Sequence, residues 1–116
     1  MGPAVFPKSS RLLARPEFRR VYDEGKRVNS ASFAVFYRRA DRPASGARAG
    51  FTVPRAVGKS VARNRIRRRL RAAVRMNLAK ADPAMDFVFN PRRTLLDTGF
   101  PALLREVEGV FLKCRT

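Results

Sequence analysis

The sequence has 116 residues, with 26 lysines and arginines against 9 aspartates and glutamates, which gives a formal net charge of +17. This length fits one domain with a modest core, and so charged a body repels itself unless a polyanion binds it. Because the chain has no histidine and a single cysteine, Cys114, a zinc site of the usual kind and a disulfide framework are excluded.

Membrane insertion is not expected. No stretch of the sequence approaches the roughly 20 consecutive apolar residues that a membrane span requires, and the N-terminal residues lack the hydrophobic segment of a signal peptide. We therefore expect a cytoplasmic protein without a membrane partner.

The chain begins with a segment that is unlike the rest. Residues 1–10 contain two prolines and are predicted to form an extended arm, followed by a single domain over residues 11–116. A first helix is predicted within RPEFRRVYDEGKRV, because Pro16 suits a first helical turn and Gly25 suits a helix end.

Strands follow this helix. Residues 30–40, SASFAVFYRRA, are rich in β-branched and aromatic residues and are predicted to form a strand. The composition of DRPASGA indicates a loop. A second strand is predicted at residues 51–53, broken at Pro54, which cannot donate to a ladder.

The second half of the chain predicts helix, strand and helix. Ser60 suits the N-cap of a helix, which should end in AKADPAM because Pro83 cannot continue it. Residues 86–91, DFVFNP, are typical of a buried strand. A final helix is predicted in FPALLREVEGVFLKC, with one apolar face formed by Leu103, Leu104, Val107, Val110 and Phe111. This order, α-β-β(-β)-α-β-α, indicates an α+β domain with two layers and a central sheet.

The helix after Ser60 has an unusual distribution of charge. Residues 57–75, VGKSVARNRIRRRLRAAVR, contain seven arginines and no acid. At 100° per residue its apolar residues form a narrow stripe that should face the sheet, and they are Ala62, Ile66, Leu70 and Ala73. The opposite face carries Asn64, Arg67, Arg68, Arg71 and Arg75. Arg63 and Arg65 flank the stripe, and Arg69 lies near it, with its stem expected to carry the charge outward.

A solvated charged face is the simplest alternative. Solvated helix faces usually mix signs, however, and like charges at i,i+4 cost about 0.2–0.5 kcal/mol per pair. Asn64 is also a poor helix former with specific donors and acceptors. We therefore expect this face to bind a densely anionic ligand, such as a nucleic acid. A structural rRNA-binding protein of the ribosomal type would account for such a face. A DNA-binding protein would account for it less well, because no helix-turn-helix pattern appears.

The arginine helix also carries a family resemblance. GKSVARNRIRRRLR resembles the signature of the protein component of bacterial ribonuclease P, and the matching positions are Gly58, Val61, Arg63, Asn64, Arg65, Ile66, Arg67, Arg68, Leu70 and Arg71. EFRRVYDEG resembles the first helix of that family, and RAGFTV and DFVF resemble its strands. Where the family often has a Ser-Lys-Lys-like stretch, this chain has Pro54, Arg55 and Ala56, so only the charge at position 55 is carried over.

The resemblance implies a fold and a function. The fold would include a left-handed βαβ crossover, against the usual right-handed rule. The protein would assist a catalytic RNA in the magnesium-dependent removal of the 5′ leader from precursor tRNA, with no obligate protein partner. It would bind no cofactor alone, because the RNA would hold the Mg²⁺ ions. The residues implied to bind the RNA subunit are Lys59, Arg63, Asn64, Arg65, Arg67, Arg68, Arg71 and Arg75.

A second surface would hold the single-stranded leader. The side chains expected there are aromatic or basic, and they are Phe18, Tyr22, Phe36, Arg55 and Arg92. Aromatic faces beside cations suit unpaired bases, which stack for about 1–3 kcal/mol each without demanding a sequence. The alternative is that the aromatic residues only fill the core, and this alternative is favoured for Phe33 and Phe51. Arg93 could extend the same groove.

The protein is not expected to perform the chemistry itself. Its nine acids are scattered, whereas a two-metal nuclease needs carboxylates that hold two ions about 4 Å apart. Without histidine there is no side chain of ordinary pKa near neutrality for general acid–base catalysis. We therefore predict no catalytic and no metal-binding residue.

Overall fold

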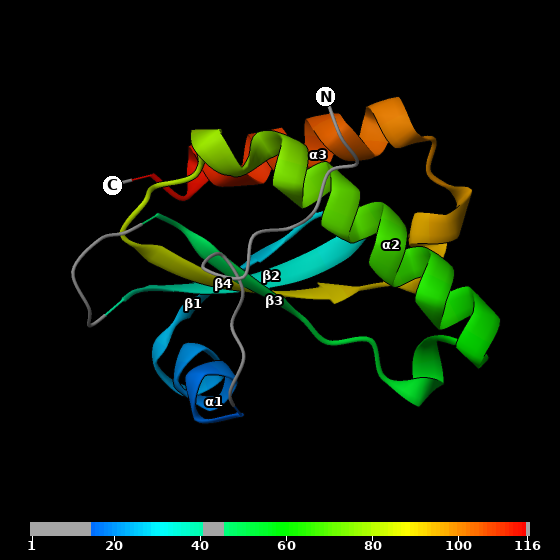
Figure 1. The fold of residues 1–116 in the computed structure, drawn as a ribbon, viewed down its shortest axis with the longest axis horizontal. Coiled ribbons are helices and arrows are strands. Elements are labelled where there is room, and N and C mark those ends of the chain that lie inside the picture. The colour runs from blue at the N-terminus through cyan, green and yellow to red at the C-terminus, as the bar shows by residue number, and fades with distance from the viewer. Residues whose placement is uncertain (1–14, 41–45, 116) are drawn as a thin grey trace.

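The computed structural model describes residues 15–40 and 46–115, so the predicted N-terminal arm lies outside the described residues. The helices are α1 (Arg15–Glu24), α2 (Ser60–Asn77) and α3 (Phe100–Lys113) (Figure 1). The strands are β1 (Lys26–Asn29), β2 (Phe33–Arg39), β3 (Arg48–Phe51) and β4 (Met85–Pro91), and short 3₁₀ turns are η2 (Arg55–Val57), η3 (Leu78–Lys80) and η4 (Arg93–Asp97).

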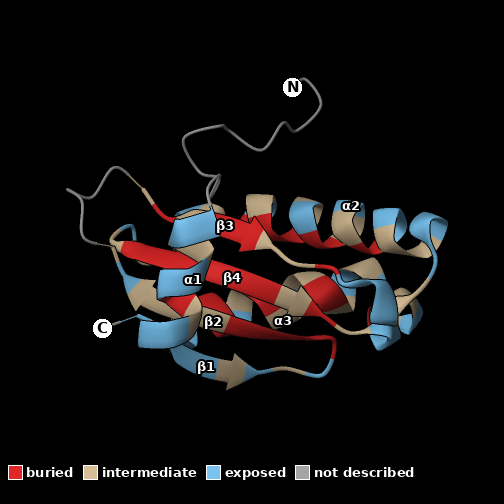
Figure 2. Ribbon diagram, turned by 90° about the horizontal axis from the view of Figure 1, so that it is seen from below, coloured by how far each residue is buried: buried red, intermediate tan, exposed pale blue. Residues whose placement is uncertain are grey.

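The strands form one mixed sheet in the order β1-β2-β4-β3. β2 pairs antiparallel with both β1 and β4, whereas β3 pairs parallel with β4. α2 connects these two parallel strands across the face of the sheet that lies away from α1 (Figures 1 and 2). This path makes the β3-α2-β4 crossover left-handed, as the family resemblance implies; Figure 2 shows the sheet from the side of α1.

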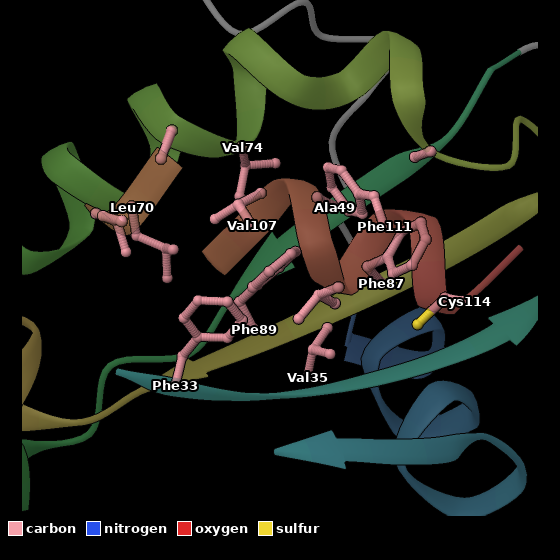
Figure 3. Packing of buried hydrophobic residues seen from close by; sticks show 14 of the residues in the cluster. Phe33, Val35, Ala49, Leu70, Val74, Phe87, Phe89, Val107, Phe111 and Cys114 are labelled. Carbon is pink, nitrogen blue, oxygen red and sulfur yellow. The ribbon is translucent and has the colours of Figure 1, made fainter. Parts of the chain in front are cut away.

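The two faces of the sheet bury different partners because side chains alternate along each strand. Phe33 of β2 and Phe87 and Phe89 of β4 point toward α2 and α3, where they form the main core (Figure 3). Phe36 and Val88 point the other way and pack against α1. The α+β class is confirmed; the sheet with α2 and α3 makes the two expected layers, and α1 adds a partial third layer.

Several predicted boundaries differ. β1 is an additional strand whose side chains are mostly exposed, so it has no alternating apolar pattern to reveal it. β3 lies at Arg48–Phe51 rather than at residues 51–53, because its parallel register aligns Arg48 with Asp86. The chain leaves the sheet soon after Thr52, whose amide still donates to Phe89 at 3.0 Å.

The limits of α2 also differ from the prediction. Lys59, not Ser60, is the N-cap, and it makes no side-chain capping hydrogen bond. Ser60 lies inside the first turn, where its Oγ accepts from Arg63 at 3.2 Å. α2 ends at Asn77, well before Pro83. The buried side-chain amide of Asn77 donates to the carbonyl oxygens of Ala73 and Leu104 at 3.0 and 3.1 Å, which fixes this end against α3.

α1 is attached to the sheet by a group of charged side chains. Arg48 of β3 donates to both carboxylate oxygens of Asp86 on β4, at 3.1 and 3.0 Å, and to Glu17 of α1 at 2.6 Å. The side chain of Arg48 is 18% exposed and that of Asp86 is 8% exposed. The hydrogen bond that Arg48 donates to Asp86 is the main reason that the pKa of Arg48 is raised.

The described part of the chain contains no helix that is both long enough and apolar enough to cross a membrane. Cys114 is buried, and its burial raises the pKa of the thiol. A protonated, enclosed thiol is a weak nucleophile.

Candidate RNA-binding surfaces

The buried stripe of α2 fixes how the helix rotates on the sheet. Ile66, Leu70 and Ala73 are fully buried, as predicted, and the buried Val74 extends the stripe toward the C-terminal end. Ala62 is only half-buried, because the N-terminal turns of α2 extend past the end of the core. Exposed residues therefore line the outer side of α2, and its buried residues face the sheet (Figure 2).

The outer side of α2 is cationic, and several of its charged side chains have no carboxylate partner among the described residues. Asn64, Arg65, Arg68 and Arg71 are exposed and Arg67 is half-buried. Among the residues that the structure describes, no acid forms an ion pair with Lys59, Arg65, Arg67 or Arg68. We call the side chains of Lys59, Asn64, Arg65, Arg67, Arg68 and Arg71 the α2 cationic face.

α1 provides a contrast within the same molecule. Arg19 lies 3.9 Å from Asp23 and Arg20 lies 3.6 Å from Glu24, both at i,i+4 spacing. Glu24 also accepts from Arg38 of β2 at 3.1 Å. Arg19 and Arg20 of α1 therefore have acids beside them, whereas no described acid forms an ion pair with Lys59, Arg65, Arg67 or Arg68.

The middle of the α2 cationic face is hollowed. A shallow depression of about 450 Å³ is lined by Val61, Asn64, Arg67, Arg68 and Arg71. Arg67 donates to the side-chain oxygen of Asn64 at 3.0 Å, which leaves the Asn64 amide hydrogens for another partner. The guanidinium of Arg71 lies 5.8 Å from the centre of the Phe51 ring, a cation–π distance.

A second hollow lies where the β3–α2 loop meets the first turns of α2. It has a volume of about 540 Å³, and its charged lining residues are Arg55, Lys59, Arg65 and Arg93. Arg55, which was expected beside the leader-binding aromatic residues, therefore lines this hollow together with signature residues. Because Lys59 and Arg65 line the same hollow, Arg55 adjoins the α2 cationic face.

Three further arginines of the signature helix are partly buried, and two of them donate to backbone carbonyl oxygens. Arg63 donates to the carbonyl oxygen of Gly58 at 3.1 Å and to Ser60 at 3.2 Å. Arg69 does not extend into solvent, because its guanidinium donates to the carbonyl oxygen of Thr98 at 2.5 Å. Arg75, expected on the outer face, is half-buried.

The structure brings three predicted leader-binding residues together. Phe18 and Tyr22 of α1 pack with Phe36 of β2 around the buried Val21 and Val88. The rings of Tyr22 and Phe36 meet edge to face, with centroids 4.9 Å apart. All three aromatic side chains are half-buried, whereas Phe33 is fully buried, as the core alternative for that residue predicted.

Polar and charged groups that sequence reasoning missed adjoin this aromatic cluster. The Tyr22 hydroxyl lies 2.7 Å from Asn90 Oδ1 and 3.1 Å from Thr52 Oγ1. The guanidinium of Arg27 lies 5.5 Å from the centre of the Phe36 ring. Thr52 directly follows β3 and Asn90 lies in β4, and these segments meet only in the folded sheet, so no local motif indicates them. Arg27 lies in a strand that the sequence does not reveal.

Arg92 holds the turn between β1 and β2. It donates to the carbonyl oxygens of Ser30 and Phe33, the latter at 3.0 Å, and to Asn29 Oδ1 at 3.1 Å. Most of its donors are therefore engaged within the protein. The structure places Arg92 at the end of the sheet, and its predicted contact with the leader stays a prediction.

Acidic side chains do not converge in the part of the chain that the structure covers, since no three histidine, cysteine, aspartate or glutamate residues there could hold a metal ion.

Glu106 accepts from Ser30 at 2.5 Å and from the amide and hydroxyl of Ser32 at 3.0 and 2.7 Å. Partial burial would raise the pKa of Glu106, but these hydrogen bonds and nearby Arg92 outweigh it, so the pKa is lowered.

Comparisons with known proteins agree with this geometry. The family model described as Ribonuclease P matches residues 6–115. The ribonuclease P protein component of Maridesulfovibrio salexigens is 39% identical over 95 residues, covering 82% of this chain and 77% of that protein. The protein of the same name from Symbiobacterium thermophilum is 36% identical over 104 residues, covering 90% of both chains.

Solved structures show the same fold. The ribonuclease P protein from Thermotoga maritima superposes with a TM-score of 0.79 at 25% identity, covering 91% of this chain and 98% of that chain. These similarities favour the ribonuclease P family over a ribosomal or DNA-binding protein, the two alternatives that charge and size alone leave open.

Proposed function

The chain belongs to the ribonuclease P protein family, and from this premise we propose that its α2 cationic face docks onto the catalytic RNA of ribonuclease P. The observation that carries this proposal is that Arg65 and Arg68 are exposed and form no ion pair with any acid that the structure describes. Arginine suits this role because its planar fork bonds phosphate in a bidentate way. Each neutralised phosphate also releases counterions, which favours assembly at low salt.

The aromatic cluster of α1 and β2 would hold the 5′ leader of precursor tRNA. Phe18, Tyr22 and Phe36 lie together and are half-buried, so each ring keeps an accessible part on which an unpaired base can stack. This cluster lies on the face of the sheet opposite α2. Catalytic RNA and leader would therefore contact different sides of one small protein.

The protein would contribute binding and electrostatics to a reaction performed by RNA. The described residues offer no set of carboxylates for a metal ion, so we derive no catalytic step from a protein-bound magnesium ion. The Mg²⁺ ions of the assembled enzyme would be held by RNA phosphates, which supply the oxygen ligands that this ion prefers. The α2 cationic face would lower the repulsion between two RNAs and thus reduce the magnesium concentration that their association needs.

Cleavage of precursor tRNA by the cognate catalytic RNA tests this function. At a magnesium concentration too low for the RNA alone, addition of the protein should restore release of the 5′ leader. A cleavage rate that does not change with added protein would reject the proposal. The RNA that co-purifies with the protein gives a second test, because ribosomal subunits in place of one RNA of a few hundred nucleotides would favour the ribosomal alternative.

A further inference from the structure

Two guanidinium groups hold the loop between β3 and α2. Arg63, in the first turns of α2, donates from Nε to the carbonyl oxygen of Gly58 at 3.1 Å and from Nη2 to Ser60 Oγ at 3.2 Å. Arg93, at the start of η4, donates from Nη1 to the carbonyl oxygen of Val57 at 3.2 Å. Two successive loop carbonyls are therefore bonded to charged donors from outside the loop.

Gly58 lets Arg93 approach the loop closely. A Cβ atom at position 58 would lie 2.8 Å from Arg93 Nη1 and 3.3 Å from the Cβ of Ala62. Any other residue at position 58 would therefore displace the Arg93 guanidinium, which is the more movable of these two neighbours. The glycine of the signature thus has a local steric reason in this structure.

Because Arg63 and Arg93 hold the loop, they determine where two cations of the second hollow lie. Arg55 and Lys59 belong to the braced segment, and both line the hollow with Arg65. Inside the loop, the amides of Val57 and Gly58 donate to Pro54 and Arg55 at 3.0 and 3.1 Å. Arg63 and Arg93 add charged donors, which bond more strongly than neutral ones of the same geometry, to these backbone hydrogen bonds.

We propose that Arg63 and Arg93 are positioning residues, which hold the β3–α2 loop so that Arg55 and Lys59 meet phosphates of the catalytic RNA. The resemblance alone implies that Arg63 contacts RNA, because Arg63 is the first residue of the signature triplet with Asn64 and Arg65. Its donors in the structure point instead to Gly58 and Ser60. The identity of the bound RNA rests on the proposed function; the bracing itself is a property of the free protein.

Equilibrium binding of the full chain to the cognate catalytic RNA, measured over a range of salt concentrations, separates the two roles. A residue that touches phosphate contributes about 0.7–0.9 to the salt slope, depending on the form of the RNA. Arg65→Gln should therefore lower the slope by about that amount. Arg63→Gln should weaken binding about tenfold, because the RNA must then order the loop that the charged hydrogen bond holds in the free protein. The slope should stay unchanged, because Arg55 and Lys59 still meet their phosphates once the complex has formed.

Arg63→Lys keeps the charge but removes the fork. A lysine binds phosphate well as a point charge but cannot reproduce the planar two-point contact with Gly58 and Ser60. We expect it to bind RNA as weakly as Arg63→Gln. Binding at the level of the wild-type protein, or a salt slope that falls in Arg63→Gln as it does in Arg65→Gln, would overturn the positioning role.

Amide hydrogen exchange on the free full-length protein tests the bracing without RNA. The amides of Val57 and Gly58 should exchange several-fold faster in Arg63→Gln and in Arg93→Gln, and at the wild-type rate in Arg65→Gln. Unchanged exchange at both amides would overturn the proposal even if RNA binding falls. If exchange changes as expected but no variant or wild-type protein binds the catalytic RNA, the bracing holds and the proposed function fails.

Discussion

Arginines that are neighbours in the signature have different surroundings in the folded protein. Arg65 and Arg68 are exposed without acid partners in the described structure, whereas Arg63 and Arg69 donate to backbone carbonyl oxygens. An arginine whose donors are already satisfied gains less from a phosphate, because it must first give up an existing hydrogen bond. At the scale of single residues, the exposed arginines are therefore the ones expected to contact RNA.

Arg68→Ala should weaken assembly with the catalytic RNA and lower the salt slope by about 0.7–0.9. The measurement is an equilibrium titration at several salt concentrations. Arg19→Ala is the matched control, because it also removes one exposed arginine, but from α1 on the other side of the sheet. An identical slope for Arg68→Ala and the wild-type protein would show that this side chain does not touch phosphate.

Phe18→Ala should weaken binding of precursor tRNA by the assembled enzyme more than binding of mature tRNA. One lost stacking contact corresponds to about 1–3 kcal/mol, and only the precursor has a leader to lose it. Phe18→Leu preserves most of the packing against Val21 and serves as the control for stability. Equal losses for the two tRNAs would place Phe18 in the core alone.

At the scale of elements, α1 is attached to the sheet by both apolar and charged contacts. Val21 enters a small cluster with Val88 of β4, and Glu17 meets the Arg48–Asp86 pair. The attachment fixes the angle between α1 and β2, and hence the arrangement of the aromatic cluster. Breaking a largely buried ion pair is more damaging than replacing it entirely, because it leaves one charge without its partner.

Arg48→Met should therefore lower the free energy of unfolding by about 3 kcal/mol, measured by urea denaturation. The double variant Arg48→Met/Asp86→Leu should recover much of this loss, since it removes both members of the pair. A double variant that is less stable than Arg48→Met would contradict this expectation. It would show that the attraction within the ion pair exceeds the free-energy cost of desolvating the two charges.

Glu106 of α3 links that helix to the β1–β2 turn through Ser30 and Ser32. Because the pKa of Glu106 is lowered in the folded protein, the ionised carboxylate stabilises the fold above the unfolded-state pKa of about 4.3. This contribution is lost as the pH falls through the folded-state pKa. Glu106→Gln should therefore be less stable than the wild-type protein at pH 7, and the difference should shrink below about pH 4. A difference in unfolding free energy that does not change with pH would contradict this role.

At the scale of the whole molecule, the sequence predicts the elements with strong apolar patterns. α2, β4 and α3 were placed close to their positions because Ile66, Leu70, Phe87 and Phe89 mark buried faces unambiguously. β1 was not separately located because Lys26–Asn29 is largely exposed. The left-handed crossover followed only from the family resemblance, since local sequence pattern does not encode the hand of a connection.

The candidate site could be predicted in part for a related reason. Periodicity correctly placed Asn64, Arg68 and Arg71 on an exposed helix face, because that face depends only on helical geometry. It could not show that Arg92 bonds the β1–β2 turn or that Arg69 bonds Thr98, because those partners are backbone carbonyls distant in sequence. The polar neighbours of Tyr22 were missed for the same reason.

The distribution of charge over the whole molecule leads to the central claim, that the α2 cationic face is the surface that docks onto the catalytic RNA. Its most direct test compares the wild-type protein with Arg65→Gln/Arg67→Gln/Arg68→Gln/Arg71→Gln in salt-dependent binding to that RNA. All four side chains lie on the outer side of the helix, so the variant should keep its fold, which circular dichroism checks. The salt slope of the variant should be lower by about 3, since each of the four lost phosphate contacts contributes about 0.7–0.9. A folded variant that binds the RNA with the slope and affinity of the wild-type protein would contradict the central claim.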